Sequence, residues 1–184
     1  ALVAITVITN AYSFNLMLRN FRQSLSSTAQ IYTEQISGKV DKINSGSLEL
    51  VSLAASSQNY YTSSPLGRYL TQQDILTRLQ DRIRYVESSD LYFFYRTDSD
   101  ELLTALSNRA STGSSYFWNQ YLMLPPTQPA NTWFSVTCNG ETWLMCYYNV
   151  SQVRVGAAVR AKTLLQSLYA DTGLVQDSGF ALAG

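Results

Sequence analysis

The stretch from Thr132 to Leu168 constrains the fold more than any other part of the chain. Two runs rich in apolar and aromatic residues flank Asn139-Gly140, a dipeptide that tolerates the positive φ angles of a type I′ hairpin turn. A third run, from Gln152 to Arg160, follows a polar turn and leads into a short amphipathic segment. The pattern predicts an antiparallel meander of strands followed by a helix, and one face of this meander must be covered by other elements.

The two cysteines, Cys138 and Cys146, invite a disulfide, but the register of the hairpin counts against one. With the Asn-Gly pair as the turn, Cys138 pairs with Glu141 and Cys146 pairs with Trp133. The two sulfur atoms then lie on opposite faces, roughly 16 Å apart at about 3.3 Å per residue. We therefore expect buried free thiols.

A stripe of apolar residues at helical spacing follows Leu18. Its members are Leu18, Phe21, Leu25, Ala29, Tyr32, Ile36, Val40 and Ile43. Their mean spacing lies between the coiled-coil period of about 3.5 residues and the free-helix period of about 3.6. A helix from about Leu16 to about Asn59 is expected, and at roughly 65 Å part of it must project or pair with another copy. The alternative is two ordinary helices separated near Gly46, since glycine weakens a helix by about 1 kcal/mol.

Residues 1–18 are mostly apolar and precede this stripe directly. We expect them to be the outer end of a transmembrane helix. The remains of a signal peptide and an ordinary buried helix are the alternatives. Arg19 and Arg22 follow at once, and the positive-inside rule would place such residues on the cytoplasmic side, which counts against a membrane span.

Between the long helix and the meander, periodicity and turn residues predict a mixture of helices and strands. The expected elements are a loop at Thr62–Leu70, a helix capped by Thr71 that ends near Ser88, strands at Leu91–Arg96 and Glu101–Leu106, and a short helix at Ser115–Leu122. The first of these strands is apolar on both faces, as a central strand requires.

The residue content excludes several classes of function. The chain lacks histidine, which removes the commonest general base and most zinc sites. Lys+Arg and Asp+Glu both number 13, and zero net charge argues against a nucleic-acid-binding protein. The acidic run Asp98–Glu101 fits a hairpin turn better than a calcium loop. We expect no enzymatic activity in this chain, no cofactor and no metal site.

Aromatic rings and a few guanidinium groups near one sheet are the remaining candidates for a binding site. An arginine among aromatic side chains suits a carboxylate or another small polar ligand, through bidentate hydrogen bonds and stacking. The alternative is that the rings form core and the arginines are solvated. The candidate ligand-binding residues are Tyr92, Phe94, Arg96, Trp118, Tyr121, Trp133 and Arg154.

Several segments resemble the extracytoplasmic Cache family of sensor domains, which carry a PAS-like sheet on a long N-terminal helix. Residues 1–60 resemble the membrane exit and stalk of that family. LYFFYRTDSDELLTAL, at 91–106, resembles its first hairpin, and VRVGAAVRAKTLLQSL, at 153–168, resembles its closing strand and helix. GLVQDSGFALAG, at 173–184, is similar to the opening hairpin of a second Cache module.

The likeness is greatest to the double-Cache sensors of YesM-like membrane histidine kinases from Gram-positive bacteria. It implies an α+β fold in which a long N-terminal helix packs on a PAS-like antiparallel sheet. The implied domains are the outer end of a transmembrane helix (1–18), a stalk helix (19–60), a membrane-distal Cache domain (61–170) and the start of a second module (171–184).

The resemblance also implies a function, that of an extracellular input domain of a two-component sensor histidine kinase in the cell membrane. Its partners would be a small-molecule ligand or an extracellular binding protein, and a second copy joined through the stalk helix. A second membrane-spanning helix is then expected after Gly184. The amino-acid-binding branch carries Arg-x-Trp-Tyr in the long loop, and SSYFWNQYLM has Trp118 without that arginine, so amino-acid specificity is not implied. The alternatives are a structural surface protein with a self-associating helix, and the Cache input domain of a chemoreceptor or another transmembrane regulator.

Overall fold

The computed structural model describes residues 2–56, 64–86, 89–110 and 112–172. The chain forms two compact units, Ala1–Gly38 and Lys39–Gly184, and helix α1 (Leu2–Ser56) contributes residues to both. The helix passes Gly38 and Gly46 without a break, so the prediction of one long helix is confirmed and the alternative of two helices is wrong. It also begins well before Leu16, the predicted start.

In the part of the chain that the structure describes, no helix combines the length and the apolar character needed to cross a membrane. The second module predicted at the C-terminus falls on residues 173–184, which lie outside the described residues.

Helix α2 (Pro65–Tyr85) begins at Pro65 rather than at Thr71, so the predicted loop at 62–70 is wrong from Pro65 onward. The Ser64 hydroxyl accepts a hydrogen bond from the backbone N–H of Gly67 at 3.2 Å and caps the helix. Pro65 occupies the first helical position, where its missing N–H costs nothing. The Ser-Pro sequence is therefore a helix start, and Thr71 lies inside the helix with its hydroxyl donating to the Gly67 carbonyl at 3.0 Å.

One antiparallel sheet of five strands follows, in the order β2-β1-β5-β4-β3. The strands are β1 (Leu91–Arg96), β2 (Glu101–Leu106), β3 (Phe134–Cys138), β4 (Glu141–Val150) and β5 (Val153–Arg160). Helix α3 (Thr112–Met123) lies between β2 and β3 in the sequence, and α4 (Ala161–Thr172) follows β5 directly. The predicted strands, the short helix and the α+β class are confirmed.

The Asn139-Gly140 turn has the expected backbone, with φ angles of 52° and 77°. Cys138 pairs with Glu141, as the predicted register requires. Both cysteines are buried and free, which confirms the prediction that no disulfide links them.

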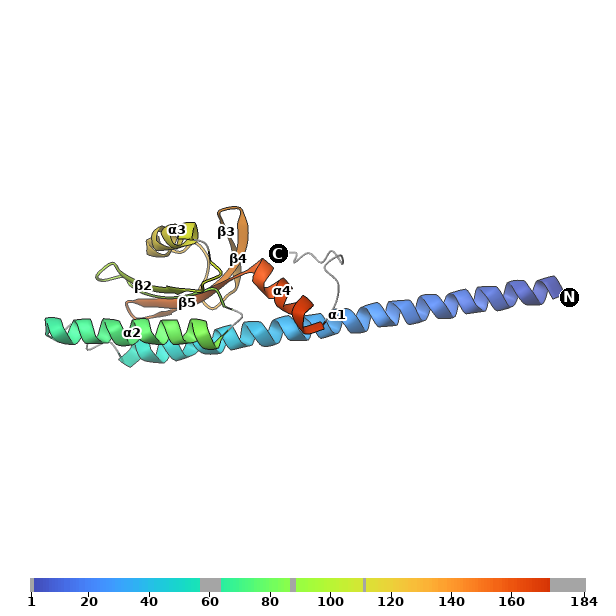
Figure 1. The fold of residues 1–184 in the computed structure, drawn as a ribbon, viewed down its shortest axis with the longest axis horizontal. Coiled ribbons are helices and arrows are strands. Elements are labelled where there is room, and N and C mark those ends of the chain that lie inside the picture. Colours follow the sequence, from blue (N-terminus) through green and yellow to red (C-terminus); the bar gives the residue numbers. More distant parts are fainter. Residues whose placement is uncertain (1, 57–63, 87–88, 111, 173–184) are drawn as a thin grey trace. The chain divides into compact units, whose positions relative to one another are not determined.

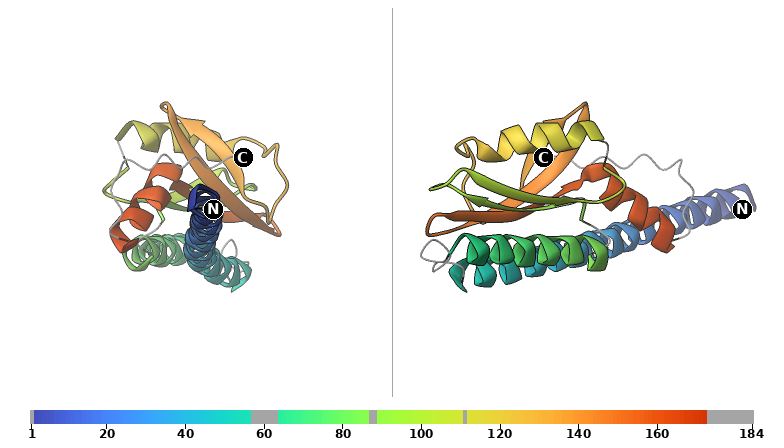
Figure 2. Two further views of the ribbon diagram at one scale, coloured as in Figure 1. Left: turned by 90° about the vertical axis from the view of Figure 1, so that its right-hand side faces the viewer. Right: turned by 60° about the vertical axis from the view of Figure 1, so that its left-hand side comes forward.

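The sheet has helices on both sides (Figures 1 and 2). Helix α2 and the part of α1 within the second unit cover one side, here called the α1 face, and α3 covers the other, the α3 face. The α1-face cluster contains Ile43, Leu50, Ala54, Ile75, Leu79, Tyr92, Phe94, Ala105, Val153, Val155, Ala157, Val159 and Leu164. The α3-face cluster contains Leu91, Phe93, Tyr95, Trp118, Leu122, Val136, Cys138, Trp143, Met145, Tyr147 and Ala158. Strand alternation produces this division, because successive side chains point to opposite faces.

Candidate functional site

Arg154 lies near the start of β5, the central strand, on the α3 face of the sheet. Val153 and Val155 on either side of it belong to the α1-face cluster, so alternation directs Arg154 toward α3. The residue is only 8% exposed. Its guanidinium carbon lies 5.4 Å from the ring centre of Tyr95 and 5.7 Å from that of Tyr147. The predicted arrangement of an arginine beside aromatic rings is therefore present, at cation–π distances from two tyrosines.

The Arg154 guanidinium binds the C-terminal end of α3. Its Nη1 atom donates hydrogen bonds to the carbonyls of Leu122 and Leu124, both at 3.0 Å. The last carbonyls of a helix lack partners within the helix and carry partial negative charge, so a cation is favourable there. Arg154 thus has a structural role, which is to fix the end of α3 and the following chain on the sheet.

A second donor of the same guanidinium is unused. The Nε atom of Arg154 is buried and has no hydrogen-bond partner in the part of the chain that the structure describes. Among the described residues, no carboxylate forms an ion pair with Arg154. Burial lowers the pKa of this guanidinium, and the nearby Tyr147 and Tyr95 offset part of the effect. A buried and unpaired cation is costly, and an anion beside it would remove that cost.

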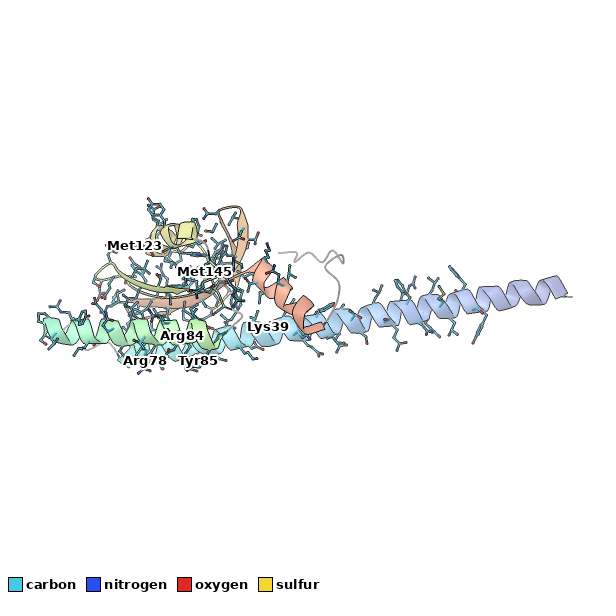
Figure 3. All side chains as sticks on the ribbon, in the orientation of Figure 1. Lys39, Arg78, Arg84, Tyr85, Met123 and Met145 are labelled. Carbon is cyan, nitrogen blue, oxygen red and sulfur yellow. The ribbon has the colours of Figure 1, made fainter. Side chains whose placement is uncertain are left out.

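Arg154 lines a pocket of about 120 Å³ under the chain that follows α3. The other lining residues are Tyr121, Leu122, Leu124, Pro125, Pro126, Thr127, Met145 and Tyr147. We call this space the Arg154 pocket. Its walls are mainly apolar, and Arg154 provides the charge. Figure 3 marks Met145 on the sheet and Met123 at the end of α3; only Met145 lines the pocket.

Hydrogen bonds to two tyrosines hold the chain around the pocket in place. The Tyr147 hydroxyl donates to the Gln128 carbonyl, and the Tyr147 carbonyl accepts from the Asn131 N–H at 2.9 Å. The Tyr95 hydroxyl donates to an Asp100 carboxylate oxygen at 2.7 Å and lies 3.4 Å from the Met123 carbonyl. The hydrogen bond to Asp100 raises the pKa of Tyr95, with burial adding to it. The pocket is therefore preformed, with its wall fixed on both β1 and β4.

Of the candidate ligand-binding residues, the fold brings Arg154 and Tyr121 together in the pocket. Trp118 lies on the same face but does not line the pocket. It is fully buried, and its ring contacts that of Trp143 edge to face, with 5.2 Å between ring centres. Trp118 is thus part of the core between α3 and the sheet.

The remaining candidates lie elsewhere. Tyr92 and Phe94 belong to the α1-face cluster, and Trp133 packs against that cluster. Arg96 is bound by Asp98, with Nε–Oδ1 and Nη2–Oδ2 distances of 3.2 and 2.8 Å. These four residues do not line the Arg154 pocket, so the candidate ligand-binding residues do not all come together there. Alternation along β1 explains the outcome, since Tyr92, Phe94 and Arg96 face away from α3.

Sequence reasoning missed Tyr95, Tyr147 and Met145 as neighbours of Arg154. Tyr95 pairs with Arg154 across the β1–β5 ladder. Tyr147 pairs with Gly156, the next residue of β5 on the same face as Arg154. The alternation pattern was correct for each strand, but only the order of the strands shows that β1 and β4 flank β5.

A second buried charge, Asp90, is fully paired. Its carboxylate accepts hydrogen bonds from Arg160 Nη2 at 3.1 Å, from the Arg160 backbone N–H at 3.0 Å and from the Ser107 hydroxyl at 2.9 Å. Burial by itself would raise the pKa of Asp90, but hydrogen bonds from Arg160, Thr163 and Ser107 hold it below the ordinary value. This cluster joins β1 to the β5–α4 junction and leaves no unpaired charge for a ligand.

Within the described ranges, no group of three or more Cys, Asp or Glu side chains could hold a metal ion. No protein-family model matches the chain, and no curated protein is similar enough to count as a relative.

Proposed function

We propose that this chain is the extracellular input domain of a membrane-bound sensor histidine kinase of the Cache type, and that a small ligand binds in the Arg154 pocket. The observation that carries the proposal is Arg154, a buried arginine that lines the pocket and whose Nε donor has no partner among the described residues. A structural arginine would normally have its buried donors satisfied. The receptor type and the membrane location in this proposal are taken from the resemblance to the Cache family.

Strand β5 can relay the presence of a ligand to the opposite face. Arg154 binds the end of α3, while its neighbours Val153 and Val155 pack in the cluster that includes α1. Because a packed core transmits displacement instead of absorbing it, a shift of β5 also moves its contacts with the helices. The ligand must bind one arrangement of these elements more tightly than the other, since otherwise no change is transmitted.

Tyr92 provides a specific contact between the sheet and α1. Its hydroxyl donates to the Ile43 carbonyl at 3.4 Å. A Cβ atom at Gly46 would lie only 2.5 Å from the same hydroxyl. The absence of a side chain at Gly46 therefore allows the tyrosine to reach the helix backbone, and the contact supports α1 as the element that receives the signal.

The first unit carries an exposed apolar stripe on α1. Leu18, Phe21 and Leu25 are 38%, 60% and 54% exposed. They are spaced by three and four residues, as in the seam of a coiled coil. We infer that this stripe pairs with the same stripe of a second copy, which would give the receptor a dimeric stalk.

The ligand-binding part of the proposal is tested by a thermal-shift screen of the purified chain against amino acids, organic acids and sugars. A compound that binds only the folded state raises the melting temperature. We expect at least one small anion to do so, and Arg154→Gln to abolish the shift. Arg96→Gln is the matched control, because Arg96 is also a buried arginine of the sheet but does not line the pocket. Equal shifts in both variants would contradict the assignment of the pocket.

The proposed dimer of the stalk helix is tested by sedimentation equilibrium of the purified chain. Phe21→Asp should weaken self-association of the chain, because it puts a charge into the apolar stripe. Gln23→Asp is the control, since it adds the same charge at an exposed position on the other side of the helix. The dimer proposal fails if the unmodified chain stays monomeric at every concentration, or if both variants behave alike.

A further inference from the structure

We infer that the ligand of the Arg154 pocket is a short aliphatic monocarboxylate, of the size of propionate. This inference rests on the proposed function, because it takes the pocket as the ligand site. Charge, hydrogen bonding and volume each narrow the class of ligand, and they do so independently.

Charge selects a single anionic group. The described residues that line the pocket include one cation, Arg154, and no Asp or Glu. The ammonium group of an amino acid would therefore lack a carboxylate partner, and the second carboxylate of a diacid would lack a cation. Either group would lose its hydration without compensation inside the pocket. A monocarboxylate leaves no charge unpaired.

Hydrogen bonding selects a ligand that carries an acceptor group. Nη1 of Arg154 is occupied by the Leu122 and Leu124 carbonyls, whereas Nε is buried and unused. A guanidinium offers only donors, so an anionic oxygen that contacts Arg154 can accept a hydrogen bond from it, while a ligand that offers only donors cannot. Charge-assisted hydrogen bonds of this type are roughly twice as strong as neutral ones. The uncharged amide of the same acid should consequently bind much more weakly.

The volume of the pocket limits the length of the alkyl chain of the ligand. The pocket measures about 120 Å³. A dry cavity of about 150 Å³ in another protein holds benzene, which suggests room here for about five non-hydrogen atoms. Propionate has that size, and its alkyl end would lie against apolar groups such as Met145, Pro125 and Leu124. Sugars and larger acids exceed the space.

The first experiment measures binding of sodium propionate to the purified chain by isothermal titration calorimetry and by thermal shift. L-alanine, succinate and propionamide serve as matched probes that add an ammonium group, add a carboxylate or remove the charge. Sodium chloride and inorganic phosphate at equal ionic strength report an adventitious anion effect. We expect binding of propionate and at least about tenfold weaker binding of the other compounds. Equal binding of propionamide or of phosphate would overturn the inference.

The second experiment changes the pocket while it keeps Arg154. Met145→Phe should fill the space and abolish propionate binding, whereas Met123→Phe should leave binding unchanged, because Met123 does not line the pocket. Met145→Ala should enlarge the space and shift the preference from propionate to butyrate or valerate. A purely structural role of Met145 would lower the melting temperature without changing the order of preference, and that result would also overturn the inference.

The two proposals fail in different ways. If L-alanine or succinate binds more tightly than propionate, and Arg154→Gln abolishes that binding, the pocket is a ligand site but the monocarboxylate inference is wrong. If no compound gives a shift that depends on Arg154, the assignment of the pocket as a ligand site is wrong as well.

Discussion

The two faces of the sheet differ in what they bury. On the α1 face, aliphatic side chains of β5 and of two helices enclose Tyr92 and Phe94. On the α3 face, β5 presents Arg154, which lies beside two tyrosine rings and a small pocket. The same central strand therefore contributes to an apolar core on one side and, on the other, to a second core that also holds one buried charge. The difference leads us to expect unequal effects of substitutions on the two faces.

The contrast between the two faces depends on β5, a strand that is covered on both faces of the sheet. Seven of the eight residues of β5, from Val153 to Val159, are buried. A charge among them is costly unless it has partners. Among the described residues, Arg154 has hydrogen bonds to two carbonyl groups and lies beside two tyrosine rings. Substitutions on the two faces should thus affect stability very differently.

The largest expected effect is on the α1 face. Phe94→Ala should lower the free energy of unfolding by about 3–5 kcal/mol, because the side chain is almost fully buried and its removal leaves a cavity. Urea unfolding followed by circular dichroism measures the loss. A loss below about 1 kcal/mol would show that the α1 face is not the stabilising core.

Tyr92 should make the stability of the protein sensitive to alkaline pH. Burial raises its pKa to about 12. Because the folded state binds this proton more tightly than the unfolded state, the stabilisation is complete below pH 10 and is lost as the pH rises toward 12. The free energy of unfolding should decrease by up to about 1.4 kcal/mol per pH unit in that window. Urea titrations at several pH values test this, and Tyr92→Phe should flatten the dependence.

A smaller effect is expected at the contact between α1 and the sheet. Gly46→Ala places a methyl group against the Tyr92 hydroxyl and should cost about 1–2 kcal/mol, although alanine favours a helix. Tyr92→Phe in the same chain should recover part of this loss, because it removes the nearest atom. A double-mutant cycle measures the coupling between the two positions. Strictly additive effects would exclude a direct contact.

The smallest effect should come from the α3 face. Arg154→Met removes two hydrogen bonds, but it also removes a buried unpaired cation, so the two contributions oppose each other. We expect a change in the free energy of unfolding of about 1 kcal/mol or less without ligand. A loss as large as that of Phe94→Ala would show that Arg154 is mainly structural, and the contrast between the faces would disappear.

Local sequence signals predicted most elements of the fold. The Asn-Gly turn, the alternation in β1 and β5 and the apolar period of α1 gave elements that the structure confirms. The start of α2 was misplaced, because Ser64-Pro65 can be a loop or a helix cap. The choice between these two depends on the contacts of the following turns and not on the dipeptide.

The candidate site was predictable only in part. The arginine among aromatic rings followed from alternation in β5, but Tyr92, Phe94 and Arg96 were grouped with it although they lie on the opposite face. Alternation divides the residues of one strand between the two faces of the sheet. It does not say which residues of a neighbouring strand lie on the same face. That relation needs the register between strands, in which Arg154 pairs with Tyr95.

The sequence by itself determined most of the secondary structure, the absence of a disulfide and the presence of an arginine at a strand position. These features depend on interactions over a few residues, or on a hairpin whose register the turn defines. The tertiary structure alone decided what surrounds that arginine. Its partners, the carbonyls of Leu122 and Leu124, come from a distant helix end, and the unused Nε results from that geometry. Hydrogen bonding of a buried charge depends on where the chain brings atoms together, and no local pattern encodes it.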